Sequence, residues 1–258
     1  DIMSPVTTLP LPPSYDSAHA AEWGYTPDTG AIAKLAAKWA ADHGLEPAGA
    51  PDSRNNHLLI IDAQNDFTNP NGTLYVGGRS GSGAIDDCAR TAELIYRNLG
   101  VFSHVTPTLD THYPFQVFTP SFWVDSSGSN PDAHTIITAD QVLRGEYTVA
   151  PAAVQFAPGK GYLWFQQYVE HYCRQLEADG KYALYLWPYH CQLGSVGHAL
   201  NGTIQEAVNF FAFARSRQTA PQVKGGSPFT ENYSVLGPEV QVAQDGTSVG
   251  QANTRFID

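Results

Sequence analysis

Short apolar runs along the chain alternate with longer stretches in which apolar residues recur every three or four positions. The apolar runs predict strands at residues 57–62, 101–109, 182–187 and 220–224. The helical spacing predicts helices at residues 29–43, 83–98, 162–178 and 203–215. Strands that alternate with helices favour right-handed crossovers and a parallel sheet. We therefore predict an α/β fold with a mostly parallel central sheet.

The domain organisation is expected to be simple. Residues 1–28 are rich in Pro, Ser and Thr and predict an extended arm, which with the following helix forms an N-terminal region over residues 1–56. Residues 57–258 are expected to form one domain, and 42% hydrophobic residues are enough for its core. Within it, residues 124–160, which include GSN, PDA and APGK, predict an inserted loop region.

Composition excludes several classes of partner. The chain has 14 Lys and Arg against 25 Asp and Glu, a net charge of −11, and such a charge repels nucleic acid and anionic membranes. No window approaches 18 uninterrupted apolar residues, and the first residues lack a basic and apolar signal peptide. Three scattered cysteines cannot form a disulfide framework. These features predict a soluble, cytoplasmic protein.

Residues with reactive side chains follow the predicted strands. They are Asp62, Asp110, His112, His190 and Lys224. In parallel sheets, ligands bind beyond the carboxyl ends of the strands, so these side chains are candidates for one site.

Each candidate also has an ordinary structural interpretation. Asp62 at the mouth of an apolar strand suits proton transfer, but an isolated acid there also suits a helix N-cap or a turn. Asp110 and His112 are of the types that bind zinc, manganese or iron, or they are polar turn residues. His190 alone is more typical of a buried, hydrogen-bonded histidine than of a ligand. Lys224 suits stabilisation of an oxyanion, or it is a solvated surface lysine.

Four motifs in order make the pattern specific. DAQNDF resembles D-x-Q-x-D-F, DTH resembles a metal-binding D-x-H, WPYHCQLGSVGHAL resembles W-P-x-H-C-x-x-G-x-x-G-A, and VKGGSPFTENYS resembles a strand-end lysine followed by Y-S. From about residue 57 to 258, the chain resembles the isochorismatase-like cysteine hydrolases and, within them, the nicotinamidases and related amidases. The resemblance implies a three-layer fold with helices on both faces of the sheet.

The resemblance also implies a metal and substrate site. Asp110, His112 and His190 would bind one divalent metal ion, which is zinc, iron or manganese in this family. Phe67 and Trp187 match the aromatic positions that sandwich a flat heteroaromatic substrate. Where the family often has a further histidine after D-x-H, this chain reads YPFQVFTPSFW, so Gln116 or water is expected to complete the coordination.

By the same resemblance, Asp62 and Lys224 would be two members of a catalytic triad whose third member is a nucleophilic cysteine. In the family this cysteine lies on a further strand after the lysine segment. We expect this chain to end, at ANTRFID, where that strand would begin, so that the domain lacks its C-terminal strands. Cys88 and Cys173 fall in predicted helices, and Cys191 is expected to face the core if His190 faces the metal. Either a companion segment supplies the nucleophile, or the chemistry proceeds without it.

The function that follows is a metal-containing amidohydrolase. It would cleave a small (hetero)aromatic or other small amide by a Cys-Asp-Lys thioester mechanism, as nicotinamidases do. The alternatives are an isochorismatase-type hydrolase that needs no cysteine and a non-catalytic metal-binding pseudoenzyme subunit. The expected partners are a small-molecule amide, further copies of the chain in a homo-oligomer, and a companion segment with the cysteine.

Overall fold

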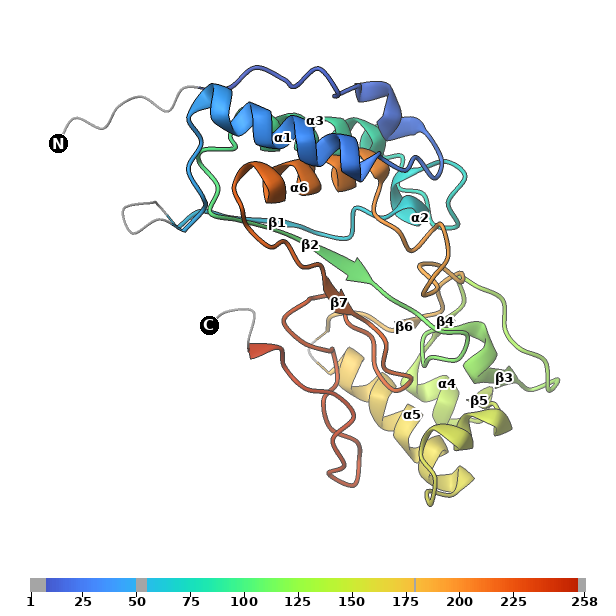
Figure 1. The fold of residues 1–258 in the computed structure, drawn as a ribbon. Coiled ribbons are helices and arrows are strands. Elements are labelled where there is room, and N and C mark those ends of the chain that lie inside the picture. Colours follow the sequence, from blue (N-terminus) through green and yellow to red (C-terminus); the bar gives the residue numbers. More distant parts are fainter. Residues whose placement is uncertain (1–7, 50–54, 179, 255–258) are drawn as a thin grey trace. The chain divides into compact units, whose positions relative to one another are not determined.

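The computed structural model describes residues 8–49, 55–178 and 180–254, and its contacts divide the chain into two compact units (Figure 1). The first unit comprises Asp1–Leu109 and Gly194–Gln222, and the second comprises Asp110–Leu193 and Val223–Asp258. The first seven residues of the predicted arm, and the last four of ANTRFID, lie outside the described residues.

The first unit contains parallel strands and the three helices that the sequence predicted there. Its elements are η1 (Ser17–Ala21), α1 (Thr29–His43), β1 (His57–Ile60), α2 (Asn65–Thr68), α3 (Gly83–Arg97), β2 (His104–Asp110, apart from its last residue) and α6 (Gly202–Ala214). β1 pairs with β2 in parallel, with His57 opposite His104 and Ile60 opposite Pro107. The strand order of the sheet is β1-β2-β7, and Gln222, the first residue of β7 (Gln222–Lys224), belongs to this unit. The predicted α/β fold with a parallel sheet is confirmed.

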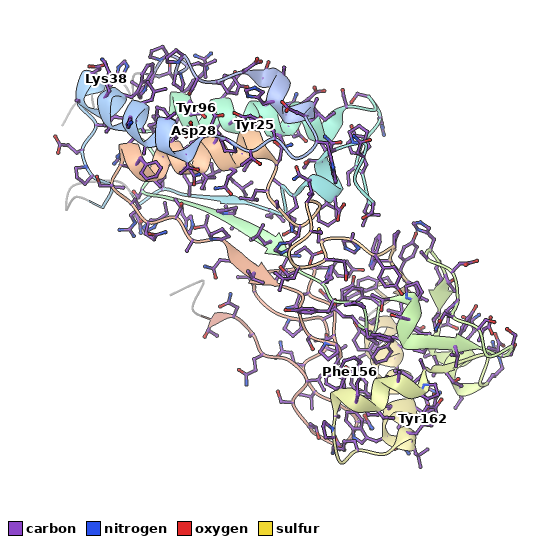
Figure 2. The ribbon with its side chains drawn as sticks, turned by 45° about the vertical axis from the view of Figure 1, so that its right-hand side comes forward. Tyr25, Asp28, Lys38, Tyr96, Phe156 and Tyr162 are labelled. Atoms are coloured by element: carbon purple, nitrogen blue, oxygen red, sulfur yellow. The ribbon has the colours of Figure 1, made fainter. Side chains whose placement is uncertain are left out.

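Local capping fixes the ends of these helices. The Asp28 side chain (Figure 2) accepts the Ala31 N–H at the start of α1, and Gly44 ends that helix in the left-handed region, with φ 61°. The Asn201 side chain accepts the Thr203 N–H at the start of α6. The predicted helical spans 29–43 and 203–215 therefore agree with the structure to within one residue.

The helices α1, α3 and α6 lie on one side of β1 and β2 (Figure 1) and bury an apolar core with them. One carboxyl group lies inside this core. Glu206 of α6, which is 3% exposed, accepts hydrogen bonds from the phenols of Tyr25 (2.8 Å) and Tyr96 (3.1 Å), both labelled in Figure 2. Because Tyr25 precedes α1, this network attaches the N-terminal arm to α3 and α6.

The second unit contains short antiparallel pairs and one long helix. Its elements are η2 (Pro120–Phe122), β3 (Trp123–Asp125), β4 (Ile136–Ile137), α4 (Ala139–Leu143), β5 (Tyr147–Val149), η3 (Pro151–Phe156), α5 (Tyr162–Glu177), β6 (Leu184–Tyr185) and the rest of β7. β3 pairs with β5, and β4 pairs with β6, both antiparallel. Residues 124–160, expected as a loop region, thus include part of β3, the strands β4 and β5, and the helices α4 and η3. Ile137, Val142 and Val149 in these elements are buried.

The prediction of a parallel-sheet strand at residues 182–187 is wrong in its pairing. Only Leu184 and Tyr185 form a strand, and it pairs antiparallel with β4. The flanking backbone bonds elsewhere: the Leu186 N–H donates to the Thr135 carbonyl and the Trp187 N–H to the Phe118 carbonyl. The backbone of this apolar run therefore forms hydrogen bonds with several other segments of the second unit, and it does not pair with β1 or β2. Among the described helices, none combines the length and the apolar composition needed to cross a bilayer.

Candidate metal centre and catalytic residues

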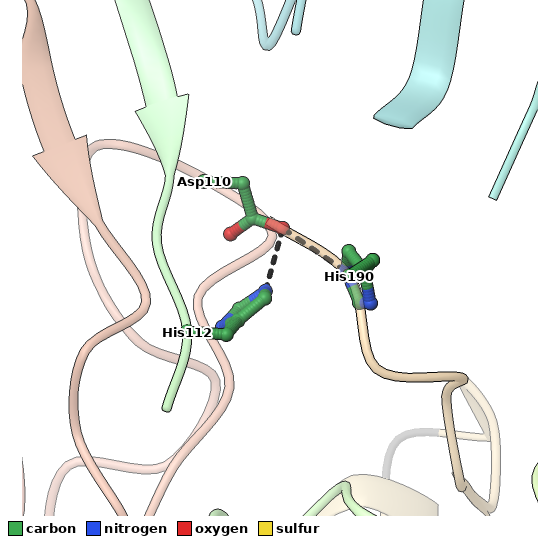
Figure 3. A group of neighbouring side chains, drawn as sticks. All are labelled: Asp110, His112 and His190. Carbon is green, nitrogen blue, oxygen red and sulfur yellow. Dashed lines mark hydrogen bonds and ion pairs between the residues drawn. The ribbon is translucent and has the colours of Figure 1, made fainter. Parts of the chain in front are cut away.

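Three predicted metal ligands converge in the second unit (Figure 3). Asp110 Oδ2 lies 2.7 Å from His112 Nε2 and 3.4 Å from His190 Nε2, and one ligand atom from each residue lies within 4.8 Å of the others. All three side chains are buried. In the described part of the chain, no other group of three His, Cys, Asp or Glu side chains is clustered in this way.

Backbone pairing brings the two motifs together. Asp110 ends β2, and His112 follows two residues later, the spacing that turns side chains toward one side of an extended segment. The His112 N–H donates to the Cys191 carbonyl at 3.0 Å, and the Leu193 N–H donates to the His112 carbonyl at 3.1 Å. These two hydrogen bonds hold the D-x-H segment beside the segment that carries His190.

Both histidines have their Nε2 atoms turned toward the carboxylate. His112 Nδ1 lies 3.2 Å from the Gly225 carbonyl, and His190 Nδ1 lies 2.6 Å from the Pro188 carbonyl. Because a carbonyl oxygen can only accept, each Nδ1 carries the hydrogen, and in the neutral ring each Nε2 keeps its lone pair. This is the arrangement in which histidine binds a metal through Nε2 while Nδ1–H is fixed by the backbone.

The donor set fits a divalent metal. Two imidazole lone pairs and one carboxylate oxygen are all acceptors, and they repel each other unless a cation lies between them. Burial by itself raises the pKa of Asp110. The contacts with the His112 and His190 rings and with the nearby Lys224 ammonium outweigh it and hold that pKa well below its ordinary value. The carboxyl group is therefore ionised and able to bind a cation.

Lys224 is not a surface lysine. It is 8% exposed, and its Nζ lies 3.3 Å from Asp110 Oδ1 and donates to the Asn232 carbonyl at 3.0 Å. The Thr111 N–H donates to the Lys224 carbonyl at 2.9 Å, which fixes the lysine beside the D-x-H segment. The second unit thus brings Lys224 together with Asp110, His112 and His190.

Gln116, which with water was one of two candidates to complete the coordination, binds backbone groups of the second unit. Its side-chain amide is fully buried, and both ends are engaged by backbone groups. Nε2 donates to the carbonyls of Gly225 (2.6 Å) and Ser227 (2.7 Å), and Oε1 accepts the Tyr113 N–H (3.0 Å). Because this N–H occupies one of the two acceptor positions of Oε1, the structure favours water over Gln116 as the further ligand that the sequence analysis expected.

One buried carboxyl group, that of Glu231, is not among the site residues that the sequence predicts. Glu231 is 6% exposed, and burial raises its pKa to about 8, although interactions with Tyr233 and Trp187 lower it. The negative charge of Asp110 raises it further. A protonated carboxyl group near the Asp-His-His cluster can donate a hydrogen bond as well as accept one. Only its burial distinguishes Glu231 from other acids, and burial depends on tertiary structure.

The two aromatic candidates, Trp187 and Phe67, lie in different units. Trp187 belongs to the second unit, with its ring 6.4 Å from that of His190 and 4.5 Å from that of Tyr185. Phe67 belongs to the first unit, where with Asp62 it lines a cavity of about 460 Å³ beside β1 and α3.

Asp62 has an unusual backbone conformation. Its φ is 50°, in the left-handed region that residues with a Cβ seldom adopt, and such residues concentrate at functional sites. Thr108, which is 1% exposed on β2, holds it from two sides. The hydroxyl group donates to Asp62 Oδ1 at 2.6 Å and accepts the Asp62 N–H at 3.0 Å. The side chain is thus held at the carboxyl end of β1.

None of the three thiols in this chain is exposed. Cys88, Cys173 and Cys191, all within the described residues, form no disulfide and are buried, as expected for two helix positions and one core-facing position. Burial raises the pKa of Cys88 to about 12 and that of Cys173 well above its ordinary value. A thiol in such surroundings supplies little thiolate, so Cys88 and Cys173 are poor nucleophiles.

Comparisons with known proteins find only distant similarity. No protein-family model and no curated protein sequence matches the chain. Similar solved structures include the yeast nicotinamidase Pnc1p bound to the inhibitor nicotinaldehyde (16% identity, 78% of this chain, 69% of that chain, TM-score 0.45). A second structure of Pnc1p has 15% identity over the same shares, with a TM-score of 0.44. An Acinetobacter baumanii nicotinamidase/pyrazinamidase has 18% identity over 77% of this chain and 62% of that chain, with a TM-score of 0.41.

Proposed function

We propose that this chain is the metal-binding part of a nicotinamidase-related amidohydrolase that cleaves the C–N bond of a small (hetero)aromatic amide. The observation that carries the proposal is the convergence of Asp110, His112 and His190, with both Nε2 atoms facing the carboxylate. The four motifs that resemble this family supply the reaction class. A zinc, iron or manganese ion bound there would act as a Lewis acid that orients a polar end of the substrate.

Asp62 is proposed as the group that moves protons. It would take the proton of the attacking nucleophile and deliver it to the departing ammonia. Its position in the cavity with Phe67, and the two hydrogen bonds with Thr108, support this role. Lys224 is proposed to favour the anionic nucleophile with its ammonium group. Phe67 and Trp187 are proposed to bind the flat ring of the substrate.

A companion segment is proposed to carry the nucleophilic cysteine. Its thiolate would attack the amide carbonyl and form a thioester as the C–N bond breaks, and water would then release the acid. The burial of all three thiols of this chain supports a nucleophile from elsewhere. So does β1, which stands at the end of the strand order β1-β2-β7 with the cavity along residues 58–62. An added strand could pair there.

The test is release of ammonia from a panel of small amides, including nicotinamide, by the natural assembly that contains this chain. Asp62→Asn keeps the shape of the side chain but removes the carboxylate, so turnover should be abolished. Asp42→Asn changes an exposed acid of α1 that pairs with Lys38, and it should leave turnover unchanged. Full turnover in the Asp62→Asn variant would contradict the proposal.

The burial of the three thiols also favours a second candidate, a hydrolase of the isochorismatase type that uses no cysteine. Alkylation separates the two. In the amidase, iodoacetamide inactivates the assembly and substrate protects it. In the cysteine-independent hydrolase, cleavage of a vinyl ether continues after alkylation. A pseudoenzyme binds metal and ligand with no turnover in either assay.

A further inference from the structure

Gln116 is a fully buried polar side chain in the same unit as the metal cluster. Its amide makes three hydrogen bonds, all to backbone groups: two donated to Gly225 and Ser227, and one accepted from Tyr113. The orientation of the amide is fixed by these partners, since the opposite orientation would set an oxygen against two carbonyls and an NH₂ group against an N–H. Gln116 therefore ties residues 225–227 to residues 113–116.

The Gly225 carbonyl connects this amide to the metal cluster. It accepts from Gln116 Nε2 at 2.6 Å and from His112 Nδ1 at 3.2 Å. The position of this one oxygen determines that His112 carries its hydrogen on Nδ1. The same histidine then offers Nε2 to the cluster, 2.7 Å from Asp110 Oδ2.

The backbone of Gly225 is held in one conformation close to the metal cluster. Its φ is +87°, and a Cβ on it would lie 2.9 Å from both Asp110 Oδ1 and His112 Cε1. The backbone is thus pressed directly against two of the three candidate ligands. Any movement of residues 225–227 therefore changes the hydrogen bond between His112 Nδ1 and the Gly225 carbonyl.

We infer that Gln116 is a positioning residue of the metal site: it holds the Gly225 carbonyl where that carbonyl selects the Nδ1–H tautomer of His112 and leaves Nε2 for the metal. This inference rests on the proposed metal site but not on the proposed amide chemistry. Partners that orient metal-binding histidines are typically worth about 10–100-fold in metal affinity.

The test compares two glutamine variants in the same unit. Gln116→Met keeps the length of the side chain and removes its three hydrogen bonds. Gln166→Met is the control, since Gln166 also accepts a backbone N–H, that of Val149 at 3.1 Å, but from a position on α5. Each protein is stripped of metal and titrated with zinc alone against a chromophoric chelator, and thermal unfolding checks that it is folded.

We expect Gln116→Met to weaken zinc binding by about 10–100-fold and Gln166→Met to leave it within about twofold. Equal affinities in wild type and Gln116→Met would overturn the inference while leaving the metal site in place. A wild-type chain that binds no zinc would overturn both.

A second measurement does not depend on the folding of any variant. Nitrogen-15 NMR of the metal-free wild-type chain reports which ring nitrogen of His112 is protonated. Hydrogen on Nδ1 supports the inference, and hydrogen on Nε2 alone overturns it. Neither the zinc titration nor the NMR experiment depends on amide hydrolysis. A natural assembly that cleaves no amide would therefore contradict the proposed reaction and leave this inference intact.

Discussion

Lys224 and Asp110 form a buried ion pair, with Nζ 3.3 Å from Oδ1. The lysine side chain is 5% exposed and the aspartate side chain 11% exposed. Since Oδ1 faces the ammonium and Oδ2 faces the two histidines, the carboxylate joins two proposed functions of the second unit, metal binding and charge stabilisation. One oxygen is left for a metal.

Removing the ammonium should therefore be costly. Lys224→Met leaves the Asp110 carboxylate buried without its cation, and we expect the free energy of unfolding to fall by about 3–5 kcal/mol. Lys160→Met, which breaks the much more exposed Lys160–Asp245 pair, should lower the free energy of unfolding far less. Urea unfolding of both variants in chelator measures the difference. Equal losses would contradict the buried pair.

The two glycines after Lys224 should respond differently to a methyl group. Gly225→Ala adds a Cβ 2.9 Å from Asp110 Oδ1 and from His112 Cε1 at a left-handed φ, and we expect zinc affinity to fall at least about tenfold. Gly226→Ala meets only Tyr113 Cε2 at 3.5 Å, an ordinary contact, and should bind zinc as the wild type does. The pair is compared by zinc titration, and matching affinities would count against the described cluster.

Glu231 predicts a specific pH dependence of stability. Burial raises the pKa of its carboxyl group from 4.5 to about 8 in the folded chain, so between these values the unfolded chain loses this proton and the folded chain keeps it. The unfolded state then binds fewer protons, and the free energy of unfolding falls as the pH rises, by up to about 1.4 kcal/mol per pH unit. The stability from this group is complete below about pH 4.5 and lost by about pH 8.

Glu231→Gln should remove this slope. In metal-free protein, the wild type should lose stability relative to the variant between pH 5 and pH 8 and run parallel to it at higher pH. Urea unfolding at several pH values measures both curves. Curves that stay parallel from pH 5 upward would show that the carboxyl group is ionised in the folded state.

The three buried thiols should resist alkylation. At pH 7.5 the raised thiol pKa of Cys88 and Cys173, and the burial of Cys191, predict that the native chain keeps its unmodified mass in iodoacetamide. In denaturant, all three thiols should react. Intact mass with peptide mapping gives the result, and rapid labelling of Cys191 in the native chain would make it a candidate nucleophile.

The helices and the cluster of ligands were predictable for physical reasons that act locally. Asp28 and Gly44 mark the ends of α1 in the sequence, and apolar spacing gives its buried face. Asp110 and His190 follow apolar runs, and strand ends are where side chains of a parallel sheet gather. The structure places both in one cluster, although β6 does not belong to that sheet.

Other features depend on contacts that are distant in the sequence. The strand at Leu184 pairs with Ile137, which lies in a stretch too short and too rich in turn residues to predict a strand. The place of Gln116 in the motif makes it a candidate ligand, whereas its observed hydrogen bonds depend on two carbonyls about 110 residues away. The burial of Glu231 is likewise a property of the packed unit.

The most direct test of the account is the zinc content of the chain, measured by native mass spectrometry after equilibration with zinc. We predict one zinc per chain in the wild type and in His134→Ala, which changes an exposed histidine of the same unit. His190→Ala should carry none. A wild-type chain without zinc, or a His190→Ala chain that retains it as well as the wild type does, would contradict the proposed centre.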